Sequence, residues 1–244
     1  MTPKLIIVSA PSGTGKSTLC DRLLQDYPEL VYSVSCTTRE PRGEEEDGVD
    51  YHFVSREKFD RLVGEDAFLE HAEVHGNCYG TLAGPIRDAL AQNLSVLLDI
   101  DVAGAAQVRE TLSRLPEGDS LRDGLVDIFI SPPSLEELRR RLEGRGEDAP
   151  EVIERRLKNA AGEMSRRDEF KFHIVNDDLE IAYRELRSVL EYCNVVNGPE
   201  NTEDDKCHCH CHGHDCHDHG CDCPEHAGDH GHGCGCHHGE CRHE

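Results

Sequence analysis

The chain has 244 residues, which is enough for one α/β domain with an added lobe or tail. Its formal net charge of -23 at pH 7 excludes a general nucleic-acid-binding protein and a protein that binds anionic membranes through charge. No apolar run approaches ~20 residues, and the N-terminus lacks the basic start and apolar core of a signal peptide. We therefore expect a cytoplasmic protein with neither nucleic acid nor membrane among its partners.

The 13 cysteines are unevenly placed along the chain. Four are scattered singly through the first 198 residues, whereas the other nine lie between Cys207 and Cys241, and twelve of the 16 histidines lie between His208 and His243. A reducing cytosol disfavours disulfides, so this cluster is typical of metal binding. Because the composition changes at 197–199, we predict one domain over residues 1–198 and a tail over 199–244.

The first predicted element is a strand from Leu5 to Val8, whose apolar run is typical of a strand buried on both faces. A loop of small residues follows, and helical apolar spacing starts at Lys16, which gives KLIIVSAPSGTGKST the order of a P-loop. In such a loop, backbone N–H groups and the helix N-terminus bind phosphates. We expect Lys16 to reach the β- and γ-phosphates and Ser17 to bind Mg²⁺. The other triphosphate-binding candidates are Ser12, Gly13, Thr14, Gly15 and Thr18.

One position departs from the general P-loop pattern, because Ala10 stands where a glycine is usual. Alanine can replace that glycine if the backbone there does not need a positive φ. A chance loop rich in glycine and serine is the alternative, and the order of strand, loop and helix argues against it. The P-loop predicts a nucleoside triphosphate but not the reaction.

The next stretch alternates short strands and helices, with turn-rich acidic residues between them. We predict, in order, a strand over 31–34, a strand over 51–54, a helix over 55–70, a glycine-bounded turn over 76–81 and a helix over 85–92.

A second buried strand is predicted over 94–101, where LSVLLDID ends in two carboxylates. Side chains repeat every two residues along a strand, so Asp99 and Asp101 should point the same way. Ligands of open α/β sheets bind at the carboxyl ends of the strands, where these residues could meet magnesium or a base. The alternative is that they cap the following loop.

The last part of the domain contains strands over 125–130 and 170–175 and helices over 134–145, 150–165 and 179–192. Both central helices carry arginines on one face, and the planar guanidinium suits phosphate oxygens. Strands that alternate with helices predict an α/β fold with a doubly wound parallel sheet.

Seven stretches together resemble guanylate kinase over about residues 3–193: VSAPSGTGKST, SVSCTTREPR, DYHFV, FLEHAEVHGNCYGT, LLDIDVAGA, PPSLEELRRRLEGRGED and IVNDD. The resemblance implies a P-loop parallel-sheet core, a small GMP-binding lobe at about 35–85 and a mobile helical lid at about 137–157. It also implies ATP and GMP as substrates, with Mg²⁺ accompanying ATP.

The resemblance also assigns roles to residues that match the family's motifs. It implies GMP phosphate binding by Ser35, Arg39, Arg42, Tyr51 and Tyr79, and guanine binding by Glu70, Thr81 and Asp101. It implies catalytic roles for Lys16, Arg141, Arg145 and Arg156, and places Asn176 near the adenine of ATP. Two departures are Cys78, where an aromatic residue is usual, and a surface loop over 113–124 that is longer than usual.

Elementary chemistry supports the choice of base. Guanine presents N1–H and N2–H₂ donors, and a carboxylate such as Glu70 can accept from both. Adenine has no N1–H, so AMP would leave a buried carboxylate unpaired.

The tail contains almost nothing to bury, so we expect it to be disordered without a ligand. Its C-x-C and H-x-H spacing differs from that of a zinc finger, and four ligands per ion allow up to about five ions. Thiolate and imidazole ligands suit Zn²⁺, Ni²⁺ or copper. In style the tail is similar to the His/Cys-rich tails of some bacterial nickel-handling proteins. The candidate ligands are Cys207, His208, Cys209, His210, Cys211, His212, Cys216, Cys221, Cys223, Cys234, Cys236 and Cys241, and Ser17 and Asp99 are the candidates for Mg²⁺.

The sequence leaves two other functions open for the domain and one alternative for the tail. A non-catalytic scaffold of guanylate-kinase shape would typically lack the P-loop, which is present here. A metal-inserting GTPase or metallochaperone should carry N-K-x-D, whereas this chain has VNDD at 175–178. The tail could also be a solvated segment that binds metal only in a test tube. Monomer and homo-oligomer stay open.

Overall fold

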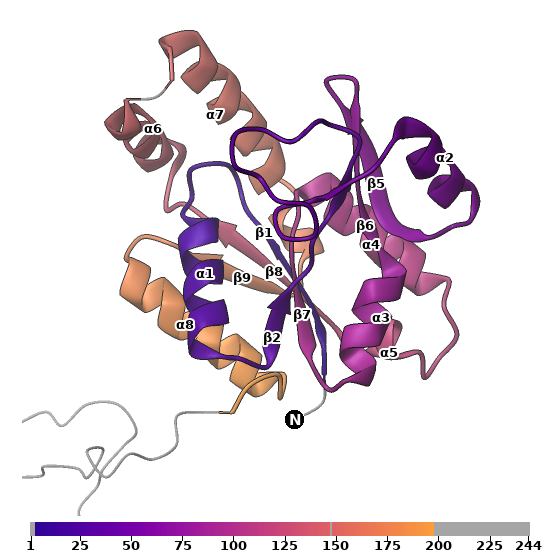
Figure 1. The fold of residues 1–244 in the computed structure, drawn as a ribbon. Coiled ribbons are helices and arrows are strands. Elements are labelled where there is room, and N and C mark those ends of the chain that lie inside the picture. The colour runs from indigo at the N-terminus through magenta and orange to yellow at the C-terminus, as the bar shows by residue number, and fades with distance from the viewer. Residues whose placement is uncertain (1–2, 147, 198–244) are drawn as a thin grey trace, which may run out of the picture. The chain divides into compact units, whose positions relative to one another are not determined.

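A five-stranded parallel sheet forms the centre of the domain (Figure 1). The structure is a computed structural model and describes residues 3–146 and 148–197. The strand order is β2-β7-β1-β8-β9, with β1 flanked by β7 and β8 through pairs such as Leu5 with Val96 and Leu125. The strands are β1 (Leu5–Ser9), β2 (Leu30–Tyr32), β7 (Ser95–Asp99), β8 (Leu125–Ser131) and β9 (Phe172–Val175). The predicted α/β fold with a doubly wound parallel sheet is confirmed.

Helices cover both faces of this sheet, because its strands carry apolar side chains on both faces. Ile6 and Val8 pack into one buried cluster with residues of α1 (Lys16–Asp26) and α8 (Leu179–Tyr192). Leu5 and Ile7 point the other way and pack against the second group of helices. That group is α3 (Ala83–Ala91), α4 (Val102–Ser113) and α5 (Ser120–Asp123).

A second, smaller sheet forms a lobe with the strand order β4-β3-β6-β5. Its elements are β3 (Cys36–Thr37), β4 (His52–Phe53), α2 (Arg56–Gly64), β5 (Phe68–Val74) and β6 (Asn77–Leu82). Phe59 of α2 stacks on Phe68 of β5, with ring centroids 4.6 Å apart, and Cys36 and Cys78 complete this small core. Cys78, which stands where the family resemblance makes an aromatic residue usual, is thus a buried core residue.

Two sequence predictions in this lobe are wrong. The helix expected over 55–70 ends at Gly64, and Phe68 begins a strand; the segment 76–81 is mostly strand β6 rather than a turn. The turn itself lies at His75 and Gly76, which both have positive φ. The apolar residues Phe68 and Leu69 fit a helical spacing, but antiparallel pairing of β5 with β6 decides their conformation.

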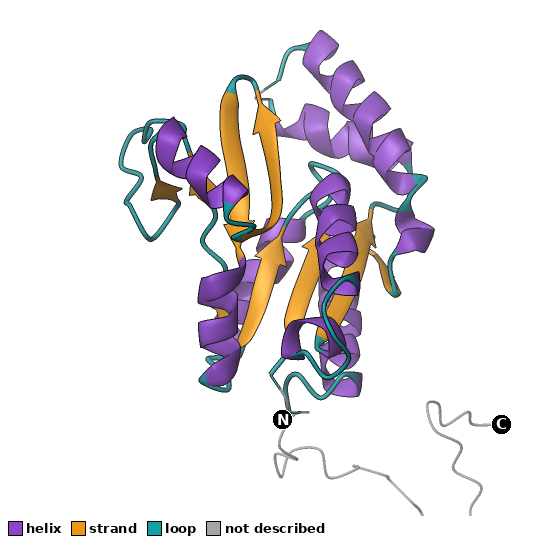
Figure 2. Ribbon diagram, turned by 90° about the vertical axis from the view of Figure 1, so that its right-hand side faces the viewer, coloured by secondary structure: helices purple, strands orange, loops and turns teal. Residues whose placement is uncertain are grey.

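Two helices, α6 (Leu135–Arg145) and α7 (Pro150–Met164), form a unit with its own core of Leu138, Leu142, Ile153 and Leu157. Figure 2 shows α6 and α7 at the upper right and the β5–β6 hairpin to their left. Both lie beyond the same end of the main sheet. A 3₁₀ turn, η1 (Arg167–Glu169), leads from α7 to β9.

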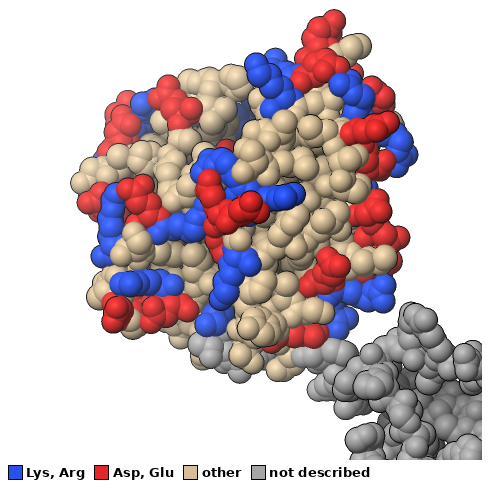
Figure 3. Space-filling view, turned by 180° about the vertical axis from the view of Figure 1, so that it is seen from behind, with Lys and Arg blue, Asp and Glu red and all other residues tan. Residues whose placement is uncertain are grey.

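The other predicted elements need only small corrections. The strand expected over 94–101 ends at Asp99, the strand expected over 170–175 starts at Phe172, and the 113–124 loop contains the short helix α5. None of the described helices is long and apolar enough to span a bilayer. On the face drawn in Figure 3, the described Lys and Arg side chains are interspersed with Asp and Glu.

Candidate active site

The P-loop connects β1 to α1. Its turn depends on two glycines that have positive φ and closely packed neighbours. Gly13 and Gly15 have φ of 90° and 96°, which L side chains rarely adopt. A Cβ on Gly15 would lie 2.6 Å from Nδ2 of Asn176, and one on Gly13 would lie 2.8 Å from Cδ2 of Leu142. Ala10 is not among the described residues with positive φ, so the substitution of the usual glycine is tolerated as expected.

Lys16 begins α1 and forms an ion pair with the carboxylate of Asp99 at the end of β7. The neighbouring Cys20 thiol is buried, and burial together with the charge of Asp99 raises its pKa to about 12. Ser17 and Thr18 are exposed on the first turn of α1, and Ser12 is exposed in the loop. The hydroxyl of Ser17 and the carboxylate of Asp99 are oxygen donors of the kind that Mg²⁺ prefers, so the residues present fit this ion.

A cleft with a volume of about 420 Å³ lies beside the P-loop. It brings together Gly13, Thr14 and Gly15, two arginines of α6 and the segment that follows β9. Arg141 donates to the carbonyl oxygens of Asn176 (2.9 Å) and Asp177 (3.2 Å), and Nδ2 of Asn176 donates to the carbonyl oxygen of Thr14 (2.7 Å). The lining residues are Gly13, Thr14, Gly15, Arg141, Gly144, Arg145, Asn176, Asp177 and Leu179.

The third arginine predicted to be catalytic is not among the residues that line this cleft. Arg156 of α7 forms an ion pair with Asp148 at 3.2 Å. Arg141 is additionally held by Glu137, whose pKa falls to about 2 because Arg140 and Arg141 donate hydrogen bonds to it. Of the predicted catalytic arginines, the structure therefore brings Arg141 and Arg145 to the P-loop, whereas Arg156 faces Asp148.

A second cluster forms in the lobe around Arg39, which is 9% exposed. The guanidinium carbon of Arg39 lies 5.3 Å from the centroid of the Tyr51 ring, and the Tyr51 and Tyr79 ring centroids are 6.1 Å apart. Ser35 is half-buried and accepts a backbone hydrogen bond from His52, whereas Arg42 is exposed. Three of the five predicted GMP phosphate residues therefore form one contiguous group.

The predicted guanine-binding residues also lie close together. Glu70 and Thr81 face each other across β5 and β6, and the Thr81 hydroxyl donates to Glu70 at 2.6 Å. A Cβ added to Gly104 would lie 3.4 Å from the Glu70 carboxylate and 3.5 Å from that of Asp101. Burial, followed by the charge of Asp101, raises the pKa of Glu70.

The expected alignment of Asp99 and Asp101 along one strand is wrong, because β7 ends at Asp99. Asp101 instead caps α4 and accepts a hydrogen bond from the backbone N–H of Gly104 at 2.7 Å. Asp101 thus caps a helix rather than the loop that the alternative named, while Asp99 faces the P-loop lysine.

Glu163 was missed by sequence reasoning. It lies on α7 two turns after Arg156, and burial and the charge of Asp101 raise its pKa, whereas Lys16 lowers it. Glu163 therefore interacts electrostatically with Lys16 of the P-loop and with Asp101, which is one of the predicted guanine-binding residues. The spacing of seven residues, which puts it on the same face as Arg156, was the available signal.

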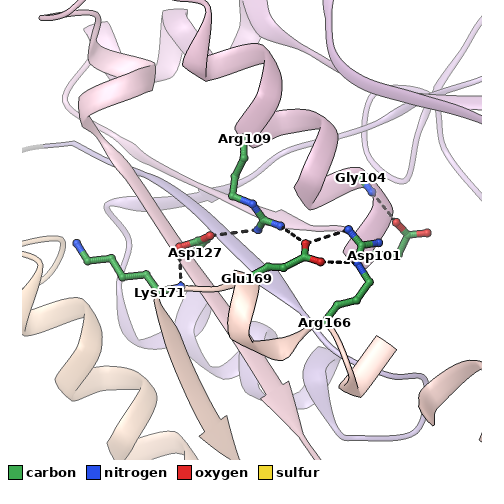
Figure 4. A network of polar contacts seen from close by, with 7 residues as sticks. All are labelled: Asp101, Gly104, Arg109, Asp127, Arg166, Glu169 and Lys171. Carbon is green, nitrogen blue, oxygen red and sulfur yellow. Dashed lines mark hydrogen bonds and ion pairs between the residues drawn. The ribbon is translucent and has the colours of Figure 1, made fainter. Parts of the chain in front are cut away.

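A polar network lies where α7 meets the sheet (Figure 4). Glu169 accepts hydrogen bonds from Arg166 (2.7 and 2.9 Å) and from Arg109 of α4 (2.9 Å). Arg109 also donates to Asp127 of β8 at 3.2 Å, and its guanidinium lies 4.6 Å from the Phe170 ring centroid. The network joins the segment after α7 to α4, which begins beside Asp101.

The candidate metal ligands of the tail lie outside the described residues, as does the predicted disorder of that segment. Among residues 3–146 and 148–197, no group of three or more His, Cys, Asp or Glu side chains is arranged to hold a metal ion.

Comparison with known proteins identifies the family. The family model for guanylate kinase matches residues 2–193. A guanylate kinase of Geobacter sulfurreducens is 48% identical over 194 residues, covering 79% of this chain and 91% of that protein. One of Neisseria meningitidis serogroup A is 49% identical over 191 residues, covering 78% and 88%. The crystal structure of guanylate kinase from Anaplasma phagocytophilum is 34% identical, covers 80% of this chain and 97% of that chain, and has a TM-score of 0.55. The chain therefore belongs to the guanylate kinase family of nucleotide-binding transferases.

Proposed function

We propose that the chain transfers the γ-phosphoryl group of ATP to GMP, giving ADP and GDP. The observation that carries this proposal is the presence of two separate sites. The cleft of the P-loop, Arg141, Arg145 and Asn176 suits a triphosphate, and the lobe presents Arg39, Tyr51 and Tyr79 beside Glu70 and Thr81. A phosphotransferase between two nucleotides needs two such sites.

In this proposal the P-loop backbone and Lys16 bind the β- and γ-phosphates, and Asn176 lies beside the adenine. Phosphoryl transfer needs in-line positioning and positive charge more than covalent help, which Lys16, Arg141 and Arg145 would supply. Arg156 would join them only after its ion pair with Asp148 is exchanged for a phosphate contact. Mg²⁺, held by Ser17 with Asp99, would neutralise charge on the triphosphate when it is bound.

The acceptor site would select GMP through its base and its phosphate. Ser35, Arg39, Arg42, Tyr51 and Tyr79 would bind the phosphate, and Asp101 would join Glu70 and Thr81 at the guanine. Glu70 already accepts from Thr81 through Oε1, and its carboxylate retains acceptor positions for the N1–H and N2–H₂ donors of guanine. Adenine would leave that half-buried carboxylate without its donors, which disfavours AMP by ~10⁴-fold or more.

We propose the same domain division as the sequence suggests: a kinase over 1–198, with the GMP lobe at about 35–85 and the lid at about 137–157, and a tail over 199–244. The family match, which ends at residue 193, supports this boundary. We also propose that the tail binds Zn²⁺, Ni²⁺ or copper ions through its nine cysteines and twelve histidines.

Neither alternative function is favoured. A match to the guanylate kinase family over residues 2–193 supports the kinase over a metal-inserting GTPase, and the P-loop and lid arginines support catalysis over a scaffold. The discriminating experiment is a coupled assay of ADP formation with GMP, AMP, UMP or CMP as acceptor. We expect turnover with GMP far above that with the others. GTP hydrolysis without a monophosphate acceptor, or no turnover with any acceptor, would contradict the proposal.

A further inference from the structure

Glu45 lies in the proposed GMP phosphate site but has no part in the reaction described above. Its two carboxylate oxygens accept hydrogen bonds from both terminal nitrogens of Arg39, each at 2.9 Å. Arg39 is 9% exposed, and the side chain of Glu45 is 26% exposed. A bidentate pair of this kind fixes the plane of the guanidinium as well as its charge.

Both members of the pair are tied to the backbone. Oε2 of Glu45 also accepts from the N–H of Arg42 at 2.8 Å, and the N–H of Glu45 donates to the carbonyl oxygen of Arg42 at 3.1 Å. Arg39 donates from Nη1 to the carbonyl oxygen of Glu40 at 2.8 Å, and its own N–H donates to the Thr37 hydroxyl at 3.1 Å. Glu45 is therefore part of the 42–45 turn and is not free to swing away from Arg39.

The hydrogen-bond capacity of Arg39 then indicates which edge faces a ligand. A guanidinium has five N–H groups. Glu45 takes two and the carbonyl oxygen of Glu40 takes one, which leaves the Nε–H and one terminal N–H. These two N–H groups remain for a phosphate and for Tyr79. Hydrogen bonding to Glu45, and to a lesser extent to Tyr79, raises the pKa of Arg39.

We propose that Glu45 is a positioning residue for GMP, holding Arg39 so that its remaining N–H groups face the phosphate of the acceptor nucleotide. The inference rests on the proposed assignment of Arg39 to that phosphate. The competing interpretation is that Glu45 imitates the phosphate and must be displaced by it. The ties of Glu45 to the turn argue for a fixed support, because displacement would break three hydrogen bonds.

The two interpretations predict opposite signs for one substitution. Glu45 carries a negative charge close to where a phosphate dianion would bind, so its removal favours binding if charge alone matters. If Glu45 positions Arg39, then Glu45→Gln turns one acceptor into a donor that faces the N–H groups of Arg39, and the guanidinium loses its orientation. We expect the Kd for GMP to rise about 10-fold or more, roughly the effect of one charge-assisted hydrogen bond. The KM for ATP should change little.

The experiment compares GMP and guanosine binding to the full-length protein by calorimetry. Glu45→Gln should weaken GMP but not guanosine, because guanosine has no phosphate for Arg39. Glu46→Gln is the matched control, because it removes the same charge from the next residue in the chain, whose side chain is exposed. It should leave both affinities unchanged. In an Arg39→Lys background, Glu45→Gln should have no further effect on GMP.

Unchanged or tighter GMP binding by Glu45→Gln would overturn the proposal, and so would an equal weakening of GMP and guanosine, which indicates general damage to the lobe. Thermal unfolding of each variant reports folding, and Glu45→Asp, which keeps the charge, supplies a second variant that should bind GMP better than Glu45→Gln. Failure of the proposed function looks different: the unaltered protein would not phosphorylate GMP at all.

Discussion

Lys16 is the residue whose loss should affect the chemistry most directly. Lys16 is the first residue of α1, directly after the P-loop glycines, and its ammonium pairs with Asp99. We expect Lys16→Ala to lower kcat by ~100-fold or more, because one preorganised donor to developing charge is typically worth that much. GMP affinity should stay near normal, since the lobe residues are untouched. Steady-state kinetics and GMP titration test this, with Lys171→Ala as a charge-matched control. Near-normal turnover would remove Lys16 from its assigned role.

Glu70 should determine both the choice of base and an acid limb of GMP binding. Replacing it with Gln puts a donor opposite the donors of guanine, and kcat/KM for GMP should fall by about 2–4 kcal/mol of transition-state stabilisation. In the native protein the pKa of Glu70 is raised, first by burial and then by Asp101. As the pH falls, Glu70 therefore protonates before an ordinary glutamate does, and the KM for GMP should rise. Glu70→Gln should lack that limb.

The same raised pKa predicts an effect of Glu70 on stability. A carboxyl whose folded pKa lies above its unfolded pKa destabilises the fold when it is ionised, and this cost disappears as the pH falls through the folded value. At pH 7, Glu70→Gln should thus raise Tm, and the gain over the unaltered protein should shrink in acid. Thermal scans from pH 7 to 4 measure this. An unchanged GMP-to-AMP preference together with an unchanged Tm would show that Glu70 neither reads the base nor carries a buried charge.

Individual site residues were predictable only where a motif fixes them. Lys16, Glu70 and Arg39 stand in stretches with a chemical reason for each residue type. The proposed role of Glu45 depends on the two distances of 2.9 Å that join its carboxylate to Arg39, and on the turn that brings the two residues together. Neither distance can be read from spacing along the chain.

At the scale of elements, the Arg109 network should contribute stability rather than chemistry. Asp127 is 6% exposed and accepts from Arg109 and from the N–H of Lys171. Asp127→Asn keeps the shape but removes the charge and leaves Arg109 with a poorer acceptor. We expect a loss of about 1–3 kcal/mol in the free energy of unfolding. Urea denaturation measures it.

Asp168→Asn is the control for that prediction, because Asp168 lies in the adjoining 3₁₀ turn and its side chain is 91% exposed. Its effect should stay within ~0.5 kcal/mol, as is usual for surface positions. Equal effects of the two substitutions would show that the network does not stabilise the junction of α4, β8 and the end of α7.

The accuracy of the element predictions follows their length. The helix over 179–192 was predicted at its observed bounds, since a long amphipathic stretch repeats its pattern several times. Two strands of the lobe, β3 and β4, have only two residues each, so periodicity carries little information there. The error over 55–70 arose because Phe68 and Leu69 continue a helical spacing from α2, although strand pairing with β6 determines their structure.

At the scale of the whole molecule, the order of strands and helices was enough to predict a parallel doubly wound sheet, but not how α6 lies against the P-loop. The contact of Leu142 with the Gly13 position and the hydrogen bonds of Arg141 to the segment after β9 depend on the turn between α6 and the sheet. The last family motif ends before the domain does, and the predicted boundary after residue 198 includes the core residues that follow that motif. Val195 and Val196, beyond the last family motif, are 1% and 3% exposed in the core.

That core contact sharpens the prediction that kinase and tail are separable. Truncation after Gly198 keeps both valines and should leave folding and GMP kinase activity near normal. Truncation after Cys193 removes them, and at about 1.5–3 kcal/mol for each buried valine it should lower the free energy of unfolding by several kcal/mol. Urea denaturation and initial rates compare the two truncations with the full chain. A large loss of activity after Gly198 would contradict separability.

The tail should account for transition-metal binding by the full-length chain. Thiols must lose protons to bind metal, so addition of Zn²⁺ or Ni²⁺ to the full chain should release protons and give a stoichiometry of up to about five ions. The chain truncated after Gly198 should bind none of these ions, because its described residues contain no cluster of three or more potential ligands. A full-length variant with serine at the nine tail cysteines separates thiolate from imidazole binding. Equal stoichiometry in the full and truncated chains would refute the tail as the metal site, whereas loss of most of the bound metal with the cysteines would assign it to the thiolates.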